Sequence, residues 1–189
     1  MSANLETQPL YDRFLKSTGR LFSVRNFSQL SGATKEELER LLEADAAHLL
    51  FTSPDDNELV GPAGPNQTAR FAADQPPFTT SFSTGKAYRF SREDEPDLTT
   101  RFSQAFGLQV EHVASAPILN ANADGIGAIV VLNTNQRQGF TLVQLDLLTS
   151  MAHLLAKTMD VIQSLEGFET LRLRLTEENK TLRKILDNP

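Results

Sequence analysis

The sequence predicts an α+β fold, with a central antiparallel sheet of about five or six strands flanked by helices and a long C-terminal coiled-coil helix. Three observations predict it: short apolar runs are paired across turn residues, apolar residues recur at helical spacing between those pairs, and one heptad pattern runs from Leu147 to Leu186. The chain has 189 residues, of which 40% are hydrophobic and 12 are Phe. That composition suits one packed domain with an appendage.

Two helices are expected before the first strand. Apolar residues at mostly helical spacing predict the first helix over roughly Gln8 to Phe22. Thr34 and Glu37 are three residues apart, which is the spacing of a capping box, and they predict the start of the second helix. The apolar stripe of this second helix would consist of Leu38, Leu41 and Leu42.

A hairpin and a long loop should follow. The stretch "HLLFTSPDDNELV", which starts at His48, predicts a strand, a turn and a strand, because the Pro54–Asn57 cluster favours a turn and cannot continue a helix. From Gly61 to Pro77 the chain carries Pro, Gly, Asn and Gln residues, which predict a long surface excursion. "PFTTSFSTGKAYRF" then predicts a short helix that ends at Gly85, and a strand from Lys86 to Phe90.

The middle of the chain predicts one more helix and a second strand pair. In "EPDLTTRFSQAFG" the apolar residues fall at helical spacing and Gly107 ends the run. Strands are expected over Val113 to Leu119 and over Ile126 to Leu132, and the Asp124–Gly125 pair between them favours a turn with positive φ. The second of these strands is β-branched and nearly continuously apolar, so it should be central and buried.

The stretch before the last helix has the features of a helix start. Thr141 occupies the N-cap position and Gln144 follows three residues later, which is again a capping box. Phe140 and Leu145 have the spacing of a hydrophobic staple, which sets the direction in which the chain enters the helix. These features explain the stretch without a ligand.

The last helix carries a heptad pattern for over five repeats. An isolated helix of this kind would expose a row of leucines to water, so the pattern predicts a homodimer through the C-terminal helix. Asn179 lies at an a position, where a buried amide can set the register of two parallel helices. The residues expected at the dimer contact are Leu154, Val161, Leu165, Phe168, Leu175, Asn179, Leu182 and Leu186.

Composition excludes several classes of function. The net charge is -6 and no stretch is rich in Lys and Arg, so direct nucleic-acid binding is not expected. The absence of Cys excludes disulfides, thiolate zinc sites and iron–sulfur clusters. With no signal peptide and no apolar run of ~20 residues, the expected location is cytoplasmic, without membrane contact. No Ser/His/Asp arrangement is visible, so the protein is not expected to be an enzyme or to hold a cofactor. A metal site is not expected either, because the candidate acidic residues lie in predicted turns: Asp55, Asp56, Glu93, Asp94 and Glu95.

Two stretches carry a family resemblance. One is "FTTSFSTGKAYRFSRED", which has a helix, a Gly and a strand; the other is "ASAPILNANADGIGAIVVLNTNQRQGFTLVQLDLLTSMAHLLA", in which a Pro-containing strand, an Asp-Gly turn, a Gly-led apolar strand, an Asn and a Phe-Thr helix start follow in order. They resemble the GAF domain, a small-ligand sensor fold related to PAS, over Leu10 to Asp160. The chain would then comprise an N-terminal helix and connector (1–30), a sensor domain (31–160) and a C-terminal signalling helix (161–189).

The resemblance implies a ligand pocket between the sheet and the helices and loops on one of its faces. That position points to Phe78, Phe82, Phe90, Phe102 and Phe106 as lining residues, although the same rings could simply fill the core. A haem-binding variant would need a His in the pocket, for which His112 is the candidate. Bilin attachment and GAF-type methionine sulfoxide reduction both use Cys, which this chain lacks.

A cyclic-nucleotide signature of the family is matched only in part. Asn133 and Phe140 agree with it, whereas three positions depart from it, and the two matches are also what a strand end and a staple would supply. The departing residues are Thr134, Gln144 and Leu145. Cyclic-nucleotide binding is therefore disfavoured.

Two functions remain open. The resemblance implies a dimeric sensory domain that binds an unknown small ligand and passes the signal through the coiled coil to an output domain, such as a transcriptional regulator, cyclase or kinase. The alternative is a ligand-free dimerisation or protein-interaction module that uses the fold as a rigid platform. Thermal stability against a panel of metabolites would distinguish the two.

Overall fold

The computed structural model describes residues 3–23, 27–53 and 57–186. In that part of the chain, helices and strands alternate along the sequence in the order expected of an α+β fold. The helices are α1 (Ala3–Phe22), α2 (Phe27–Leu42), α3 (Phe78–Thr84), α4 (Pro96–Phe106) and α5 (Leu142–Leu186). The strands are β1 (Ala46–Thr52), β2 (Glu58–Gly64), β3 (Gln67–Ala72), β4 (Tyr88–Ser91), β5 (His112–Leu119) and β6 (Gly125–Asn133).

The strands form a 6-stranded sheet in the order β3-β2-β1-β6-β5-β4. Every neighbouring pair is antiparallel. β6, the β-branched strand, lies in the middle between β1 and β5, as the sequence predicts. Both of its faces are covered, because six of its residues from Gly127 to Leu132 are buried without alternation.

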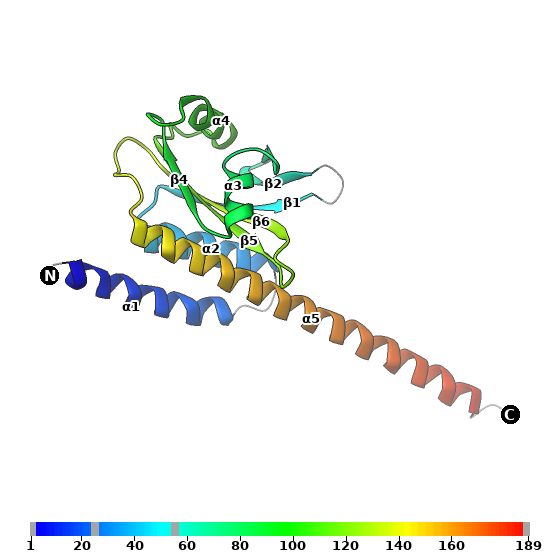
Figure 1. Cartoon of the computed structure of the whole chain (residues 1–189). Helices are drawn as coiled ribbons and strands as arrows, with labels where there is room; N and C mark the ends of the chain where they lie inside the picture. The colour runs from blue at the N-terminus through cyan, green and yellow to red at the C-terminus, as the bar shows by residue number, and fades with distance from the viewer. Residues whose placement is uncertain (1–2, 24–26, 54–56, 187–189) are drawn as a thin grey trace.

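The sheet separates two apolar cores. Figure 1 shows α1, α2 and the first half of α5 below the sheet, with α4 above it. α3 contributes Phe78 to the core on the upper side. Leucines of α1 and α2 share the lower core with Leu148, Met151 and Leu155 of α5. The upper core is built mainly from aromatic rings, among them Phe78 and Phe102.

The predicted start of the second helix is wrong. α2 begins at Phe27, so Thr34 and Glu37 lie inside the helix, and the Thr34 hydroxyl donates to the carbonyl of Leu30 (2.7 Å) instead of capping. Leu30 is fully buried, and packing of that first turn against the core extends the helix. Glu37 instead accepts hydrogen bonds from Ser17 (2.5 Å) of α1 and from other partners.

The predicted surface excursion from Gly61 to Pro77 is also wrong in its first part. β2 continues through Gly64, and β3 pairs with it after a turn in which Asn66 has a φ of 63°. In β3, buried Ala69 and Phe71 alternate with exposed neighbours, which is a strand pattern too short to stand out among Pro and Gly residues.

The turn between β5 and β6 differs in detail from the expectation. Positive φ occurs at Ala123 (65°) and not at Gly125. The side-chain oxygen of Asn120 accepts the backbone N–H groups of Asn122 and Asp124 (both 2.9 Å), and these bonds organise the turn. Gly125 serves close packing, since a Cβ there would lie 2.8 Å from the ring of Phe82.

α5 begins as the sequence predicts. The Thr141 N–H donates to the side-chain oxygen of Gln144 (2.8 Å), and the Gln144 N–H donates to the Thr141 hydroxyl (3.3 Å), which is a reciprocal capping box. Phe140 is buried, and Leu145 packs against the same core. Both halves of the predicted staple therefore reach the lower core.

The heptad pattern of α5 lies in two different environments, one buried and one exposed. Leu147, Met151 and Thr158 are buried against the body of the domain. Leu154, the first of the expected contact residues, is partly buried against the lower core. Val161 and Leu165 are 56% and 55% exposed, where α5 extends past the body (Figure 1). Farther along α5, the structure describes the backbone but not the side chains of the other expected contact residues: Phe168, Leu175, Asn179, Leu182 and Leu186. None of the described helices combines the length and apolar character needed to cross a membrane.

Replacing Gly127 by Ala should destabilise the sheet. A Cβ at this position would lie 2.5 Å from the backbone oxygen of Leu50 in β1, so the two central strands would have to move apart. We expect Gly127→Ala to lower the free energy of unfolding by about 2 kcal/mol in urea denaturation. Gly19→Ala on α1 is the control, because a Cβ there meets nothing within 4 Å and should stabilise the helix by about 0.5–1 kcal/mol. A neutral Gly127→Ala would contradict this strand spacing.

Candidate functional site

A cluster of phenylalanine rings fills the upper side of the sheet. Phe71 of β3 lies near its centre, with its ring centroid 4.6 Å from Phe102, 5.6 Å from Phe78 and 5.8 Å from Phe106. Phe90 of β4 closes the cluster with its ring centroid 5.8 Å from that of Phe102. These spacings are those of packed aromatic pairs, so the rings are in mutual contact.

Most of the predicted pocket residues meet in this cluster. Phe78, Phe90, Phe102 and Phe106 are buried there, and Phe82 packs against it half-buried. Sequence reasoning missed Phe71, because its strand was interpreted as part of a surface loop. The rings lie where the expected pocket would be, and in this conformation they pack against one another.

His112 lies apart from the cluster. It pairs with Ser91, which alternates with Phe90 along β4, so its side chain lies on the lower face of the sheet. There it borders a cavity of about 190 Å³ between the end of β4 and the start of α5. The lining residues are Arg89, Phe90, Ser91, Asp94, His112, Val113, Gly139 and Phe140.

The polar groups of this cavity are already engaged with one another. The Asp94 carboxylate accepts the hydroxyl (2.6 Å) and the N–H (3.1 Å) of Ser91, and these hydrogen bonds lower the pKa of Asp94. Arg89 donates to the backbone oxygen of Phe140. Within residues 3–23, 27–53 and 57–186, no group of three His, Asp or Glu side chains is placed to hold a metal ion.

His48 of β1 joins the aromatic cluster. Its ring stacks on Phe106 with a centroid distance of 4.0 Å, and its Nδ1 lies 3.1 Å from the carbonyl oxygen of Pro62. Its Nε2 is buried and has no hydrogen-bond partner within the structure. Burial lowers the pKa of His48, the Pro62 carbonyl opposes that shift, and the positive charge of Lys35 adds to the lowering. The ring is therefore neutral at pH 7.

The lowered pKa of His48 predicts a loss of stability in mild acid. The folded state binds a proton at His48 less readily than the unfolded state does. The contribution of His48 to the free energy of unfolding is therefore fully present above the unfolded pKa of about 6.5, and it is lost as the pH falls toward the folded pKa. We expect the free energy of unfolding to decline as the pH falls below about 6.5, and His48→Phe to flatten that decline. His153→Gln is the control, because His153 is exposed. Equal slopes for His48→Phe and wild type would contradict the prediction.

Asn133, the residue that matched the cyclic-nucleotide signature, has a structural role. It is 4% exposed. Its side-chain nitrogen donates to the carbonyl of Gln138 (2.9 Å), and its side-chain oxygen accepts the N–H of Asp45 (3.2 Å). Phe140, the second match, is buried in the lower core. Both residues therefore have structural roles in the segment that connects β6 to α5.

A family model for the GAF domain matches residues 26–159. The chain belongs to the GAF family. The match spans the chain from just before α2 to the buried half of α5, so it contains the upper core and all of the buried lower-core residues of this GAF domain except Leu21 and Ile162. No curated protein matches the chain.

Solved structures share the fold of this GAF domain. The GAF domain of an Acinetobacter phosphoenolpyruvate-protein phosphotransferase is 9% identical with a TM-score of 0.63, covering 87% of this chain and 97% of that one. The free methionine-R-sulfoxide reductase from Neisseria meningitidis, solved with its substrate, is 15% identical with a TM-score of 0.68, covering 87% and 96%. A bacteriophytochrome from R. palustris is 13% identical with a TM-score of 0.66, covering 89% of this chain but 41% of that one. At these identities the likeness shows the fold alone.

Proposed function

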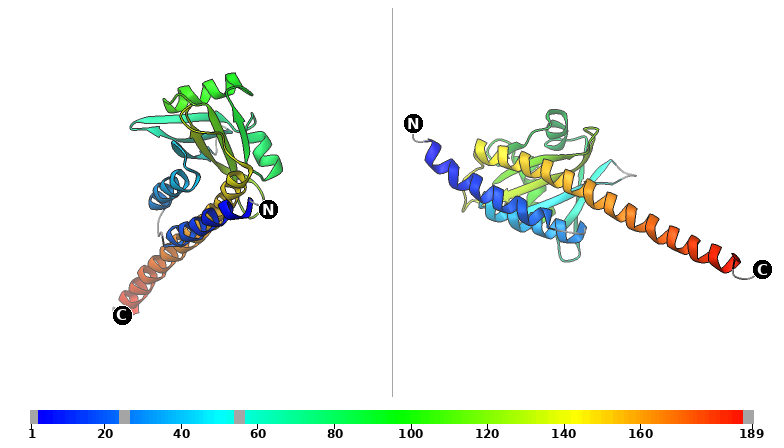
Figure 2. Two further views of the ribbon diagram at one scale, coloured as in Figure 1. Left: turned by 90° about the vertical axis from the view of Figure 1, so that its left-hand side faces the viewer. Right: turned by 90° about the horizontal axis from the view of Figure 1, so that it is seen from below.

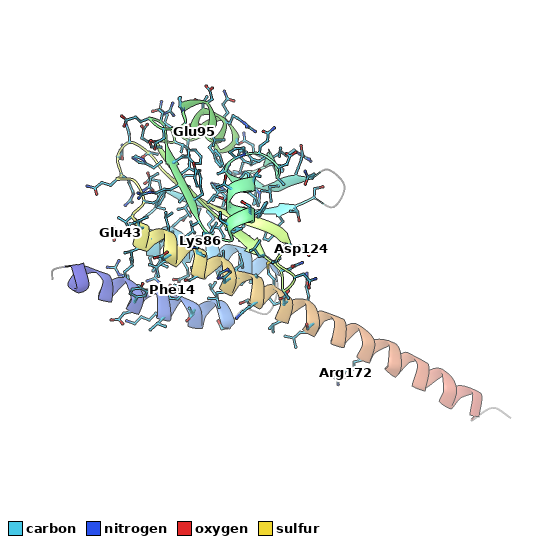
Figure 3. All side chains as sticks on the ribbon, in the orientation of Figure 1. Phe14, Glu43, Lys86, Glu95, Asp124 and Arg172 are labelled. Atoms are coloured by element: carbon cyan, nitrogen blue, oxygen red, sulfur yellow. The ribbon has the colours of Figure 1, made fainter. Side chains whose placement is uncertain are left out.

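We propose that this GAF domain is a non-catalytic, dimeric sensory module that binds a small ligand between the sheet and helices α3 and α4. Its signal would pass along α5 to an output domain such as a transcriptional regulator, cyclase or kinase. The observation that carries the proposal is the exposure of Val161 and Leu165 on the part of α5 that leaves the body. Figure 3 shows the labelled Arg172 still farther along this projecting part.

The exposed apolar side chains favour a second copy as the partner. Among the described side chains, five large apolar ones are exposed, and four of them lie on α1 or on the later part of α5: Tyr11, Leu15, Val161 and Leu165. Each pair is separated by four residues, so its members share one face of their helix. Both views in Figure 2 place α1 alongside the first half of α5. Apolar stripes of this kind are typical of helices that associate.

Strands β5 and β6 connect the two cores. Alternate residues of β5 enter opposite cores, with Val113 above and Ala114 below, and β6 divides in the same way between Val130 and Ile129. A ligand that displaces the upper rings would thus act on the strands against which α5 packs. If the two α5 helices of the dimer have two possible arrangements, the ligand can shift them only by binding the protein more tightly in one arrangement than in the other.

Sedimentation of the full chain tests the dimer. We expect a dimer for wild type, and a dissociation constant raised about 100-fold in Val161→Lys/Leu165→Lys, since two desolvated apolar side chains are replaced by charges. Leu142→Lys is the matched control, because Leu142 is 69% exposed on the first turn of α5, away from the projecting part. A wild-type monomer at high concentration, or an unchanged dimer in the double variant, would reject the proposal.

The close packing of the rings favours a second candidate function, a ligand-free dimerisation platform. Unfolding in the presence of a metabolite panel that includes cyclic nucleotides separates the two. A ligand at a hundred times its dissociation constant should add about 2.7 kcal/mol to the free energy of unfolding. Unchanged stability across the panel, with the dimer intact, would favour the platform.

A further inference from the structure

We infer that His48 and Ser115 are the polar contacts of the ligand site on the upper face, and that this site takes an uncharged aromatic molecule with an N–H or O–H donor, such as an indole or a phenol. The inference rests on the proposed function, because it assumes that a ligand enters between the sheet and α4. It adds which chain atoms bind the ligand and what chemistry the ligand must have.

The two residues lie in one row across the sheet. Tyr88 of β4 pairs with Ser115 of β5, Ser115 pairs with Val130 of β6, and Val130 pairs with His48 of β1. Residues paired in this way project from the same face of a sheet. Val130 belongs to the upper core, and the ring of His48 stacks on Phe106, so this row faces the aromatic cluster. Two strand spacings separate the backbones of His48 and Ser115 by about 10 Å.

Each of the two side chains carries a buried polar atom without a partner. The Nε2 of His48 and the Oγ of Ser115 make no hydrogen bond within the structure, although the residues are only 7% and 0% exposed. An unsatisfied buried group of this kind costs about 1–3 kcal/mol, and folded proteins leave few of them. Two such atoms in one row beneath one aromatic layer point to a molecule that completes both.

The hydrogen-bond geometry determines what the ligand must offer to His48. A carbonyl oxygen can only accept, so the contact between Nδ1 and the Pro62 oxygen places the imidazole proton on Nδ1. Nε2 is therefore an acceptor, and the ligand must present a donor to it. Ser115 can donate or accept, so a second polar group at the far end of the ligand could bond to its hydroxyl.

The surroundings determine the rest of the ligand. The upper core consists of apolar residues, so a charged group would lose its hydration without an ionic partner. The nearby Lys35 further disfavours a cation. An aromatic ring whose donor lies in the plane of the His48 imidazole can displace Phe106 and pack against the remaining phenylalanine rings of the cluster. This displacement requires α4 to shift, and its free-energy cost lowers the apparent affinity.

Calorimetric titration of the full chain with indole and benzofuran tests the donor requirement. Benzofuran has nearly the shape of indole but carries oxygen in place of the N–H. We expect wild type to bind indole about 5-fold more tightly than benzofuran, which corresponds to one net hydrogen bond. His48→Phe keeps an aromatic ring but lacks the acceptor, so it should bind the two probes equally. His112→Phe, on the opposite face of the sheet, should keep the wild-type preference.

5-Hydroxyindole tests the contact with Ser115. It also keeps the inference testable if His48→Phe fails to fold. Its added hydroxyl should gain affinity over indole in wild type, and Ser115→Ala should remove that gain while keeping the preference for indole over benzofuran. Equal binding of indole and benzofuran to wild type, no binding of either, or a preference that persists in His48→Phe would overturn the inference. If another metabolite stabilises the protein equally in wild type and Ser115→Ala, the inference fails while the proposed sensory function stands.

Discussion

Phe102→Ala should lower the free energy of unfolding by about 3–5 kcal/mol, the largest effect that we expect from a single substitution in this domain. Phe102 is fully buried, and its ring centroid lies 4.6 Å from that of Phe71, 5.8 Å from Phe90, and 6.2 Å from both Phe78 and Phe106. Truncation would remove the contacts at the middle of the aromatic cluster and leave a cavity that these rigid rings fill poorly.

Urea denaturation of the full chain measures this loss. Phe82→Ala is the matched control, since it removes the same atoms from a half-buried ring at the edge of the cluster and should cost about 1–2 kcal/mol. A loss below about 1 kcal/mol for Phe102→Ala would show that the cluster is loosely packed. That result would also mean that a ligand could enter with little rearrangement of the rings.

Glu37→Gln should cost about 3 kcal/mol at pH 7, the second largest effect. The Glu37 carboxylate is only 5% exposed, and it accepts hydrogen bonds from Ser17 (2.5 Å), Arg20 (2.7 Å) and Arg40. Ser17 and Arg20 belong to α1 and Arg40 to α2, so this single carboxylate joins the two helices. Hydrogen bonds to a buried charge are stronger than neutral ones, and the amide would lose several of them.

The pH dependence of unfolding checks the origin of that effect. Burial raises the pKa of Glu37, but the hydrogen bonds from Ser17, Arg40 and Arg20 outweigh burial, so its pKa is lowered overall. A lowered folded pKa means that the stabilisation is present above the unfolded value of about 4.3 and is lost as the pH falls through the folded value. The difference in stability between wild type and Glu37→Gln should therefore shrink as the pH falls below the unfolded value and through the folded pKa of Glu37.

Glu43→Gln provides the comparison for an exposed ion pair. Glu43 lies 3.4 Å from Arg13, and the two side chains are 69% and 49% exposed, so its loss should cost less than about 0.5 kcal/mol. Parallel pH profiles for wild type and Glu37→Gln would show that the carboxylate is not charged in the folded protein. In that case α1 would be held to α2 by apolar packing alone.

Local chemistry explains which elements could be predicted. The pair Thr141 and Gln144 forms its capping box because the whole motif lies within four residues and needs no distant contact. The same spacing at Thr34 and Glu37 predicted a helix start wrongly, because the turns before it are held in a helix by burial of Leu30. The capping pattern is therefore informative only where no buried helical turn precedes it.

The candidate site divides in a similar way. Phe102 and Phe106 could be assigned from helical spacing within one short segment. His48, Ser115 and Phe71 could not, because their significance comes from strand pairing between segments far apart in the chain. The periodicity of a single strand identifies the side chains that share a face but carries no information about which strand lies beside it.

By itself, the sequence determined the α+β class, the central position of β6, the start of α5 and the requirement that the apolar face of α5 be covered. Each of these follows from residue type and spacing within one segment. Only the tertiary structure decided that Leu147 and Met151 are covered by the chain's own sheet while Val161 and Leu165 are left exposed. Apolar periodicity shows that one face of a helix must be buried away from water. Which surface buries it depends on where the chain folds back, and contacts between distant residues determine that.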